Sequence, residues 1–469
     1  MPTTDDVRVE RDSMGEVRVP ASALYGAQTQ RAVDNFPVSG QPLPARIIHA
    51  LGLVKLAAAR VNRELCLLDP ALAAAVETAA REVADGAHDD QFPIDVFQTG
   101  SGTSSNMNAN EVIATIASRA LDSTVHPNDH VNLGQSSNDV IPTVLHLAAV
   151  LAIEEDLVPA LQRLHDTLAA KAEEFDDVVK IGRTHLMDAV PIRLGQEFGG
   201  YARQIELAVA RFEAALPGLR ELAIGGTAVG TRLNTHAEFG ARVARELSEL
   251  TGTHFEEAAN HFEAQGSRDA YVFAAGTLTT IAAALMKIAN DVRLLASGPQ
   301  AGLGELLLPA IQPGSSIMPG KVNPVICESV IQVGAQVTGN CQAVTIGGQW
   351  GQLDLNVMLP MMACNLLESV RLLANACHMF VDKCLTDTTA NVERCAGSIE
   401  RSIAMATALT PLIGYDRAAA IAKESHATGR TVRDIAYDKS GLTRDQVDAA
   451  LDPRRQTIPG ATTGPGAGG

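Results

Sequence analysis

The chain has 469 residues, a net charge of −17, 46% hydrophobic residues and only 4% aromatic residues. A length of this order suits about three domains, and an aliphatic, aromatic-poor composition is typical of helices packed through small side chains, so we predict an all-α protein. The acidic balance, without any run of Lys or Arg, argues against nucleic acid as a partner.

The sequence also lacks signals for a membrane or a metal centre. Its start, MPTTDDVRVERDSMG, has no basic-then-apolar signal pattern, and no uncharged apolar stretch of about 18 residues suggests a membrane span. We therefore expect a cytoplasmic protein without membrane contact. No two cysteines form a C-x-x-C pair, so we expect no metal and no cofactor. The cysteines are predicted to be buried or incidental thiols: Cys66, Cys327, Cys341, Cys364, Cys377, Cys384 and Cys395.

Residues 1 to about 45 form a mixed polar, turn-rich segment, and the first amphipathic helix is predicted over residues 45–65. A second long helical segment is predicted from Pro142 to Phe175. Pro159 should kink or restart this segment, because proline removes a helix hydrogen bond.

The clearest helical pattern lies in residues 278–297, which end just before Gly298, a helix stop signal. Alanines on the other faces of this helix predict several packed neighbours, and therefore a bundle of long helices. The apolar seam is spaced by three and four residues and consists of Leu278, Ile281, Leu285, Ile288, Val292 and Leu295.

Beyond about Cys395 the predicted helices are shorter. Thr443 and Gln446 predict a capping box at the start of one of them, and Pro453 marks its end. The Gly-rich end predicts a disordered tail. We therefore expect an N-terminal domain over 1–136, a central helical domain over 137–393, a small helical domain over 394–459 and a tail over 460–469.

Four stretches combine glycine with hydroxyl and amide side chains: residues 99–111, 126–139, 181–189 and 314–324. Each is expected to lie near a helix N-terminus, where such residues commonly act as caps. Four together favour an anion-binding surface made of backbone N–H groups and polar donors. With one lysine in the last stretch, a small carboxylic acid is the natural ligand.

Three other kinds of site are less well supported by these stretches. No P-loop ending and no G-x-G-x-x-G motif is present, which leaves nucleotide binding weakly indicated. His126, Asp129 and His130 lie in a Pro-Asn loop without a further nearby ligand, so an anion-contacting loop is favoured over a metal site. A Ser-His hydrolase lacks the G-x-S-x-G elbow.

The same stretches resemble the motifs of the fumarase/aspartase superfamily, whose members eliminate a group beta to a carboxylate to give fumarate. The resemblance covers nearly the whole chain and is strongest to class II fumarate hydratases. It rests on VPASALYGAQTQRAVDNF, GSGTSSNMNANEV, HPNDHVN, QSSND, GRTHL, GGTAVGTRLNTH, GSSIMPGKVNP and LIGYDRAAAIAK.

Two positions favour a fumarate hydratase over the second candidate, an aspartate ammonia-lyase. Aspartate ammonia-lyases usually have Gln at the place of His185 and Thr at the place of Ser137. The resemblance therefore implies reversible hydration of fumarate to L-malate. A non-catalytic structural protein on the same fold is the other alternative, although Ser315, His185 and Lys321 are all present.

The resemblance also implies roles for individual residues. Ser315 is the base that removes the carbon-bound proton, His185 is the acid on the hydroxyl side with Glu328 holding its charge, and Lys321 holds the growing carboxylate charge. The implied substrate-binding residues are Ser101, Gly102, Thr103, Ser136, Ser137, Asn138, Thr184, Ser316, Lys321, Val322 and Asn323.

A second anion site is implied at His126, Pro127, Asn128 and Asp129, although Ser123 stands where fumarases often have an arginine. The resemblance further implies a three-domain fold and a homotetramer. In it, the long central helices form one shared bundle and each active site is assembled from three subunits.

Overall fold

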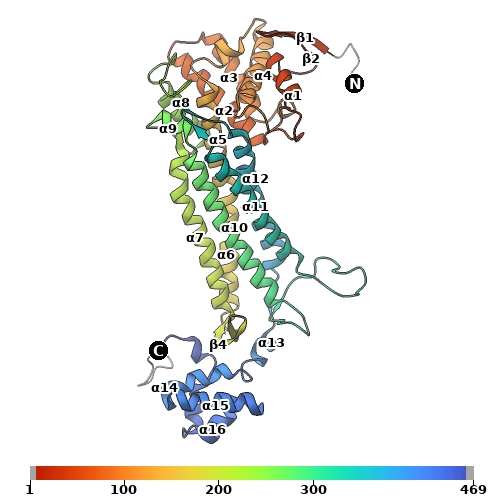
Figure 1. Ribbon diagram of the computed structural model, residues 1–469, viewed down its shortest axis with the longest axis vertical. Helices are drawn as coiled ribbons and strands as arrows, with labels where there is room; N and C mark the ends of the chain where they lie inside the picture. Colours follow the sequence, from red (N-terminus) through yellow and green to blue (C-terminus); the bar gives the residue numbers. More distant parts are fainter. Residues whose placement is uncertain (1–6, 461–469) are drawn as a thin grey trace. The chain divides into compact units, whose positions relative to one another are not determined.

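The computed structural model describes residues 7–460, and most of them are helical, as the all-α prediction requires (Figure 1). Contacts divide the chain into two units. The first contains the residues up to Pro159, Ala208–Ala282 and Val333–Ala374. The second contains Ala160–Leu207, Ala283–Gln332 and the residues from Asn375 onward. The predicted domain division into 1–136, 137–393 and 394–459 stays a prediction.

The helices fall into three groups: those within the first unit, those with residues in both units, and those within the second unit. The first unit contains α1 (Ala27–Asn35), α2 (Ala45–Glu64), α3 (Pro70–Ala84), α4 (Thr103–Leu121), α5 (Ser137–Ala152), α8 (Phe239–Thr251) and α9 (His261–Gly266). Five helices have residues in both units: α6 (Val158–Glu174), α7 (Leu194–Arg220), α10 (Asp269–Leu295), α11 (Val325–Gly348) and α12 (Leu359–Phe380). The second unit ends with α13 (Val392–Gly397), α14 (Thr410–Ile413), α15 (Tyr415–Thr428), α16 (Val432–Lys439) and α17 (Arg444–Ala450).

Strands occur in the described residues only as two-stranded pairs. The first unit has the antiparallel pair β1 (Val7–Asp12) and β2 (Gly15–Pro20), the parallel pair β5 (Glu221–Leu222) and β6 (Glu256–Glu257), and the antiparallel pair β8 (Gly351–Gln352) and β9 (Leu355–Asn356). The second unit has the antiparallel pairs β3 (Val179–Thr184) with β4 (Met187–Arg193) and β7 (Leu306–Leu307) with β10 (Thr389–Ala390).

The N-terminal segment is more regular than the sequence analysis predicted. Instead of an irregular stretch up to about residue 45, it contains the β1–β2 hairpin and helix α1 (red in Figure 1). Valine alternates with charged residues in both strands, which is the pattern of a half-buried hairpin. Val19 is fully buried, and Gly15 has the positive φ of 118° that the turn requires.

The predicted helices are present with shifted ends. Helix α2 confirms the prediction for residues 45–65. The segment predicted from Pro142 begins earlier, at Ser137, and is interrupted by a π-helical turn over Ile153–Leu157 just before Pro159. Proline has no backbone N–H to donate to the preceding turn of the helix. A wider, π-helical turn just before Pro159 is therefore expected.

Helix α10 confirms the predicted apolar seam, because every seam side chain from Leu278 to Leu295 is buried. It begins at Asp269 and ends before Gly298. By length and composition alone this helix could cross a membrane, with a mean hydropathy of 1.7 over its most apolar window, although core helices of water-soluble proteins pass the same test. Half of that window is buried inside the structure, as in the core helix of a soluble protein.

The C-terminal helices and Ile181 of β3 form a small apolar core. Leu409, Ile421, Ile435 and Val447 are buried together in it. The predicted capping box is confirmed, because Thr443 and Gln446 exchange side-chain and backbone hydrogen bonds at the start of α17. The predicted tail lies, apart from Gly460, outside the described residues.

Candidate active site

In the first unit, the starts of α4 and α5 bring two of the predicted polar stretches together. Gly102 precedes α4 with a φ of 72°, and a Cβ there would lie 2.8 Å from Ile141 of α5, so only glycine fits. Asn106 of α4 donates from Nδ2 to the Ser137 hydroxyl over 2.9 Å. The predicted residues Ser101–Thr103 and Ser136–Asn138 therefore line two neighbouring helix N-termini, which favours an anion.

Hydrogen bonds fix the orientation of several of these side chains. The hydroxyls of Ser101 and Thr103 are 2.8 Å apart. Ser136 caps α5 in a capping box with Asp139. The Asn138 amide donates to the carbonyl of Ala228 over 2.8 Å, which joins this helix start to the loop after β5. The polar groups are thus held in place before any ligand binds.

Two buried ionisable side chains lie beneath this group. Lys55 of α2 is fully buried and donates from Nζ to Asn132 and Gln135, each over 2.9 Å. Asp139 is fully buried and accepts backbone N–H groups of Gly225 and Thr227 over 3.1 and 2.8 Å. Burial lowers the pKa of Lys55 to about 7 and raises the pKa of Asp139 to about 6.

Sequence reasoning missed these supporting residues. Asn106 and Asp139 lie inside motifs that it had singled out, so their positions were a usable signal. Lys55 lies in a helix whose sequence is amphipathic, where a lysine is ordinarily expected on the solvent side. Nothing local in the sequence marks it as buried.

In the second unit, the loop before α11 holds Ser315 in a closed turn. The Ser315 hydroxyl oxygen accepts the backbone N–H groups of Ile317 and Met318 over 3.2 and 2.9 Å. The N–H of Gly314 donates to the carbonyl of Lys321 over 2.7 Å, and the Asn323 amide donates to the carbonyl of Gly314 over 2.6 Å. Two donors therefore point at the oxygen that is predicted to act as a base.

The rest of this loop faces solvent. Ser316, Lys321 and Val322 are exposed, and Asn323 is half-buried through its bond to Gly314. Glu328 lies in the first turn of α11. In the described part of the chain, neither Lys321 nor Glu328 has a side-chain hydrogen bond, so the polar ends of both remain available.

The stretch 181–189 does not lie at a helix start, so that prediction was wrong. It forms the turn of the β3–β4 hairpin, in which His185 and Leu186 have positive φ values of 56° and 61°. Two successive residues in the left-handed region match the tight turn that the twist of paired strands favours, usually with Gly, Asn or Asp. Here the turn presents Thr184 and His185 to solvent.

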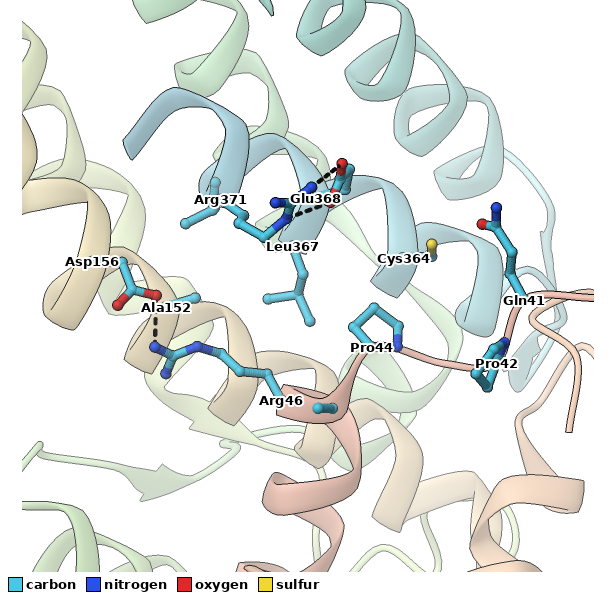
Figure 2. Close-up of a pocket in the computed structure, with 12 residues that line it drawn as sticks. Gln41, Pro42, Pro44, Arg46, Ala152, Asp156, Cys364, Leu367, Glu368 and Arg371 are labelled. Carbon is cyan, nitrogen blue, oxygen red and sulfur yellow. Dashed lines mark hydrogen bonds and ion pairs between the residues drawn. The ribbon is translucent and has the colours of Figure 1, made fainter. Parts of the chain in front are cut away.

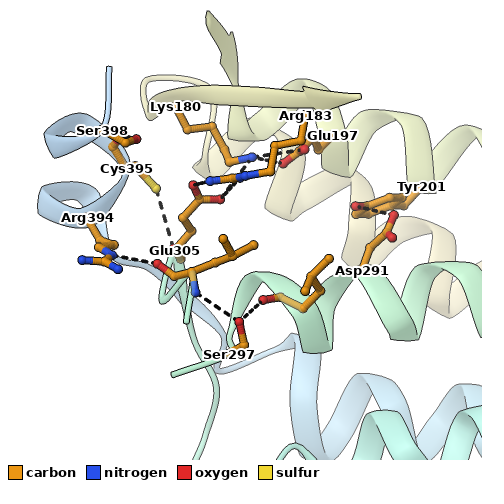
Figure 3. Close-up of polar contacts among 12 residues, drawn as sticks. Lys180, Arg183, Glu197, Tyr201, Asp291, Ser297, Glu305, Arg394, Cys395 and Ser398 are labelled. Atoms are coloured by element: carbon orange, nitrogen blue, oxygen red, sulfur yellow. Dashed lines mark hydrogen bonds and ion pairs between the residues drawn. The ribbon is translucent and has the colours of Figure 1, made fainter. Parts of the chain in front are cut away.

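A buried ion-pair network anchors this hairpin (Figure 3). Glu305 is 1% exposed and accepts two bonds from the guanidinium of Arg183, at 3.0 and 2.7 Å. Lys180 of β3 lies 3.2 Å from Glu305 and 3.0 Å from Glu197 of α7. Because Arg183 directly precedes Thr184 and His185, Glu305 ties the turn to the rest of the second unit.

The residues of the predicted second anion site form a π-helical turn over Pro127–Val131, with His126 at its start. His126 lies 3.2 Å from Asp129, and both side chains are largely exposed. The nearby Ser123 contributes its backbone N–H to helix α4 rather than a charge to this turn.

The described contacts bring only some of the predicted site residues together. Within the first unit, Ser101–Thr103 and Ser136–Asn138 meet. Within the second, the Ser315 loop and the His185 turn are separate structures, and no described hydrogen bond or ion pair joins His185 to Glu328. The implied site residues are distributed over both units.

A cavity of about 560 Å³ in the first unit lies elsewhere, and none of the predicted site residues lines it (Figure 2). Arg46 and Arg371 flank it, and each is paired with acidic neighbours. Its size therefore does not identify it as the active site.

Comparison with known proteins identifies the class of this chain. A family model described as Lyase matches residues 15–339, and one described as Fumarase C C-terminus matches residues 405–457. The crystal structure of recombinant class II fumarase from Schistosoma mansoni is similar with a TM-score of 0.95 and 40% identity, covering 97% of this chain and 100% of that chain. Fold and family model together define a lyase.

Curated relatives identify the family within the lyases. Fumarate hydratase class II of Corynebacterium efficiens is 56% identical over 96% of both chains. Fumarate hydratase class II of Mycobacterium tuberculosis is 58% identical over 96% of this chain and 95% of the relative. A fumarate lyase:delta crystallin of Brucella melitensis, with cobalt bound, is similar with a TM-score of 0.93 and 47% identity, covering 97% of this chain and all of that chain. The chain therefore belongs to the class II fumarate hydratase family.

Proposed function

We propose that this protein is a hydro-lyase that interconverts L-malate and fumarate. The observation that carries the proposal is the Ser315 loop, in which two backbone N–H groups point at one serine oxygen within a chain of this family. A serine hydroxyl is an ordinary weak base, but donors at its oxygen stabilise the alkoxide form.

In the proposed reaction, the Ser315 alkoxide takes the proton from the carbon beside one carboxylate of malate. The electron pair left on that carbon delocalises into the carboxylate, where Lys321 and Asn323 stabilise the added charge. Expulsion of hydroxide from the adjacent carbon forms the double bond of fumarate. His185 supplies the proton that makes the leaving group water, and Glu328 balances the charge of the imidazolium.

Ser101, Gly102, Thr103, Ser136, Ser137, Asn138, Thr184, Ser316 and Val322 complete the proposed substrate site. The paired N-termini of α4 and α5 support this part of the proposal, because they offer backbone N–H groups to a second carboxylate. The dicarboxylate is thus bound at both ends while its central carbons react.

We further propose a cytoplasmic homotetramer with active sites shared between subunits. The resemblance implies this assembly, and the distribution of the implied site residues over both units agrees with sites that draw on several chains. The HPND turn, His126 to Asp129, is the proposed second anion site. Ser123 stands where fumarases often have an arginine, so this site has one positive charge fewer.

The experiment is an ultraviolet assay of fumarate formation by the purified protein, run in parallel with L-malate and with L-aspartate. Formation from malate with no formation from aspartate is expected. Formation from aspartate alone would make the protein an ammonia-lyase, and formation from neither would favour a non-catalytic role on the same fold.

A further inference from the structure

A second cavity, of about 720 Å³ and lined mainly by polar and charged residues, lies within the second unit. Its walls come from the Arg183 end of β3, the loop over residues 299–305 and the region of α13. A volume of this size is in the range of small-molecule sites. The residues that matter for its chemistry are Arg183, Gln300, Glu305, Asn391, Glu393, Arg394 and Arg401.

The charges that line this cavity are unequally paired. Arg183 is neutralised by Glu305, as described above. Arg394 and Arg401 have no carboxylate partner in the described part of the chain, and Glu393 is the one lining acid without a cation. The cavity therefore carries excess positive charge in a protein whose net charge is −17.

Both unpaired guanidinium groups are held in position by backbone oxygens. Arg394 donates from Nε to the carbonyl of Leu303 and from Nη2 to the carbonyl of Gly302, each over 2.8 Å. Arg401 donates from Nε to the carbonyl of Gly397 over 3.1 Å. Each guanidinium keeps further N–H groups free, and the fixed orientation lowers the entropy lost when an oxyanion binds.

We propose that this cavity binds a small polyvalent oxyanion between Arg394 and Arg401. The site is distinct from the proposed substrate residues, and the proposal does not depend on the proposed reaction. Guanidinium groups match phosphate and carboxylate oxygens in the same geometry, so both chemistries fit. The amides of Gln300 and Asn391, which also line the cavity, supply neutral donors.

The test is titration calorimetry with inorganic pyrophosphate and, separately, with the tricarboxylate tricarballylate. Four forms of the full chain are compared: unaltered, Arg401→Gln, Glu393→Gln and the control Arg245→Gln. Arg401 is exposed, so its replacement should leave the fold intact, which circular dichroism checks. Arg245 is an exposed arginine of α8 that does not line this cavity and that, within the described residues, pairs with Glu249.

We expect Arg401→Gln to weaken binding about tenfold, since a charge-assisted contact is lost. Glu393→Gln should tighten binding, because it removes the unpaired carboxylate. Arg245→Gln should bind as the unaltered protein does. Binding of pyrophosphate alone or tricarballylate alone would assign the site to phosphates or to carboxylates.

Three results would overturn the proposal. The first is that neither anion binds at millimolar concentration. The second is that Arg401→Gln and Arg245→Gln weaken binding equally. The third is that the Arg401→Gln form binds the anion as tightly as the unaltered protein does and releases it when L-malate is added. The last result would place the bound ion at the proposed substrate site instead.

Discussion

Ser315 is hydrogen-bonded within its own loop, whereas the His185 side chain is exposed, so the two side chains are held in position in different ways. The Ser315 oxygen already has two backbone donors within its own loop. The exposed His185 ring makes no described hydrogen bond, so its position depends on the backbone of its turn. Loss of the serine oxygen should therefore affect chemistry alone, whereas changes near the hairpin can displace the imidazole.

Replacing Ser315 with Ala should leave a folded protein that still binds dicarboxylate, because the closing bonds of the loop run between Gly314, Lys321 and Asn323. We expect kcat to fall by several orders of magnitude while dicarboxylate affinity changes little. Malate dehydration kinetics and equilibrium binding of fumarate measure the two effects. Near-normal turnover would contradict the role of Ser315 as base.

Replacing His185 with Gln should lower kcat by roughly 100- to 10,000-fold, because the proton donor for the leaving hydroxide is lost. The measurement is the steady-state rate with saturating malate. A change confined to KM would instead make His185 a binding residue.

At the scale of single elements, the β3–β4 hairpin shows how a strained turn is stabilised. Non-glycine residues with positive φ cost about 1–3 kcal/mol each, which the surrounding structure must offset. The buried carboxylate of Glu305 provides that support through Arg183, whereas among the described residues the carboxylate of Glu197 forms its ion pair with Lys180.

The variants Glu305→Gln and Glu197→Gln form a matched pair. Glu305→Gln should destabilise the protein by about 3–5 kcal/mol, since buried cations lose their partner. It should also lower kcat, because Arg183 no longer holds the His185 turn. Glu197→Gln should cost less and leave kcat nearly unchanged. Thermal unfolding and malate kinetics test this, and equal losses in both variants would show that Glu305 has no special link to the turn.

Helix α5 carries a buried histidine whose titration should appear in stability. His146 hydrogen-bonds the carbonyl of Glu221 over 2.9 Å and stacks on Tyr271 with ring centroids 6.3 Å apart. Burial, followed by the positive charge of Arg268, lowers the pKa of His146 from 6.5 to about 3. The unfolded chain therefore binds this proton at a higher pH than the folded chain does, and stability falls as pH drops from 6.5 toward 3.

The variant His146→Phe removes this titration and keeps an aromatic ring beside Tyr271. Between pH 6.5 and 5 the unaltered protein should lose about 2 kcal/mol more stability than the variant, from the linkage slope of a single proton. Urea unfolding at both pH values measures the difference. The same pH dependence in both proteins would mean that His146 is not the group responsible.

At the scale of the whole molecule, the implied site residues are distributed among separate parts of one chain. The first-unit group around Asn138 and the second-unit loop around Ser315 belong to different compact units. If assembly of subunits unites them, some sites in a mixed oligomer will contain only unaltered loops.

Asn138→Ala and Ser315→Ala should therefore rescue each other. The two inactive variants are refolded together and their malate dehydration is compared with that of each refolded alone. Activity well above the sum of the controls is expected. Mixed oligomers, demonstrated by differently tagged chains, that remain inactive would show that each site belongs to a single chain.

Much of the fold could be predicted because its signals are local. The three-and-four spacing from Leu278 to Leu295 identified a buried helix, and Thr443 with Gln446 identified a helix start. The β1–β2 hairpin was missed although valine alternates in both strands. The turn at His185 could not be recognised from its composition, because it lacks the Gly, Asn or Asp that usually marks such a turn.

By itself, the sequence determined that this protein is helical, which loops carry polar chemistry and which family it resembles, because periodicity and motif composition are properties of neighbouring residues. Only the tertiary structure decided that Lys55 and Asp139 are buried beneath the helix starts. It alone also decided that Glu305 anchors the His185 turn. These contacts join residues 77 or more positions apart in sequence, and burial of charge depends on everything that folds around it.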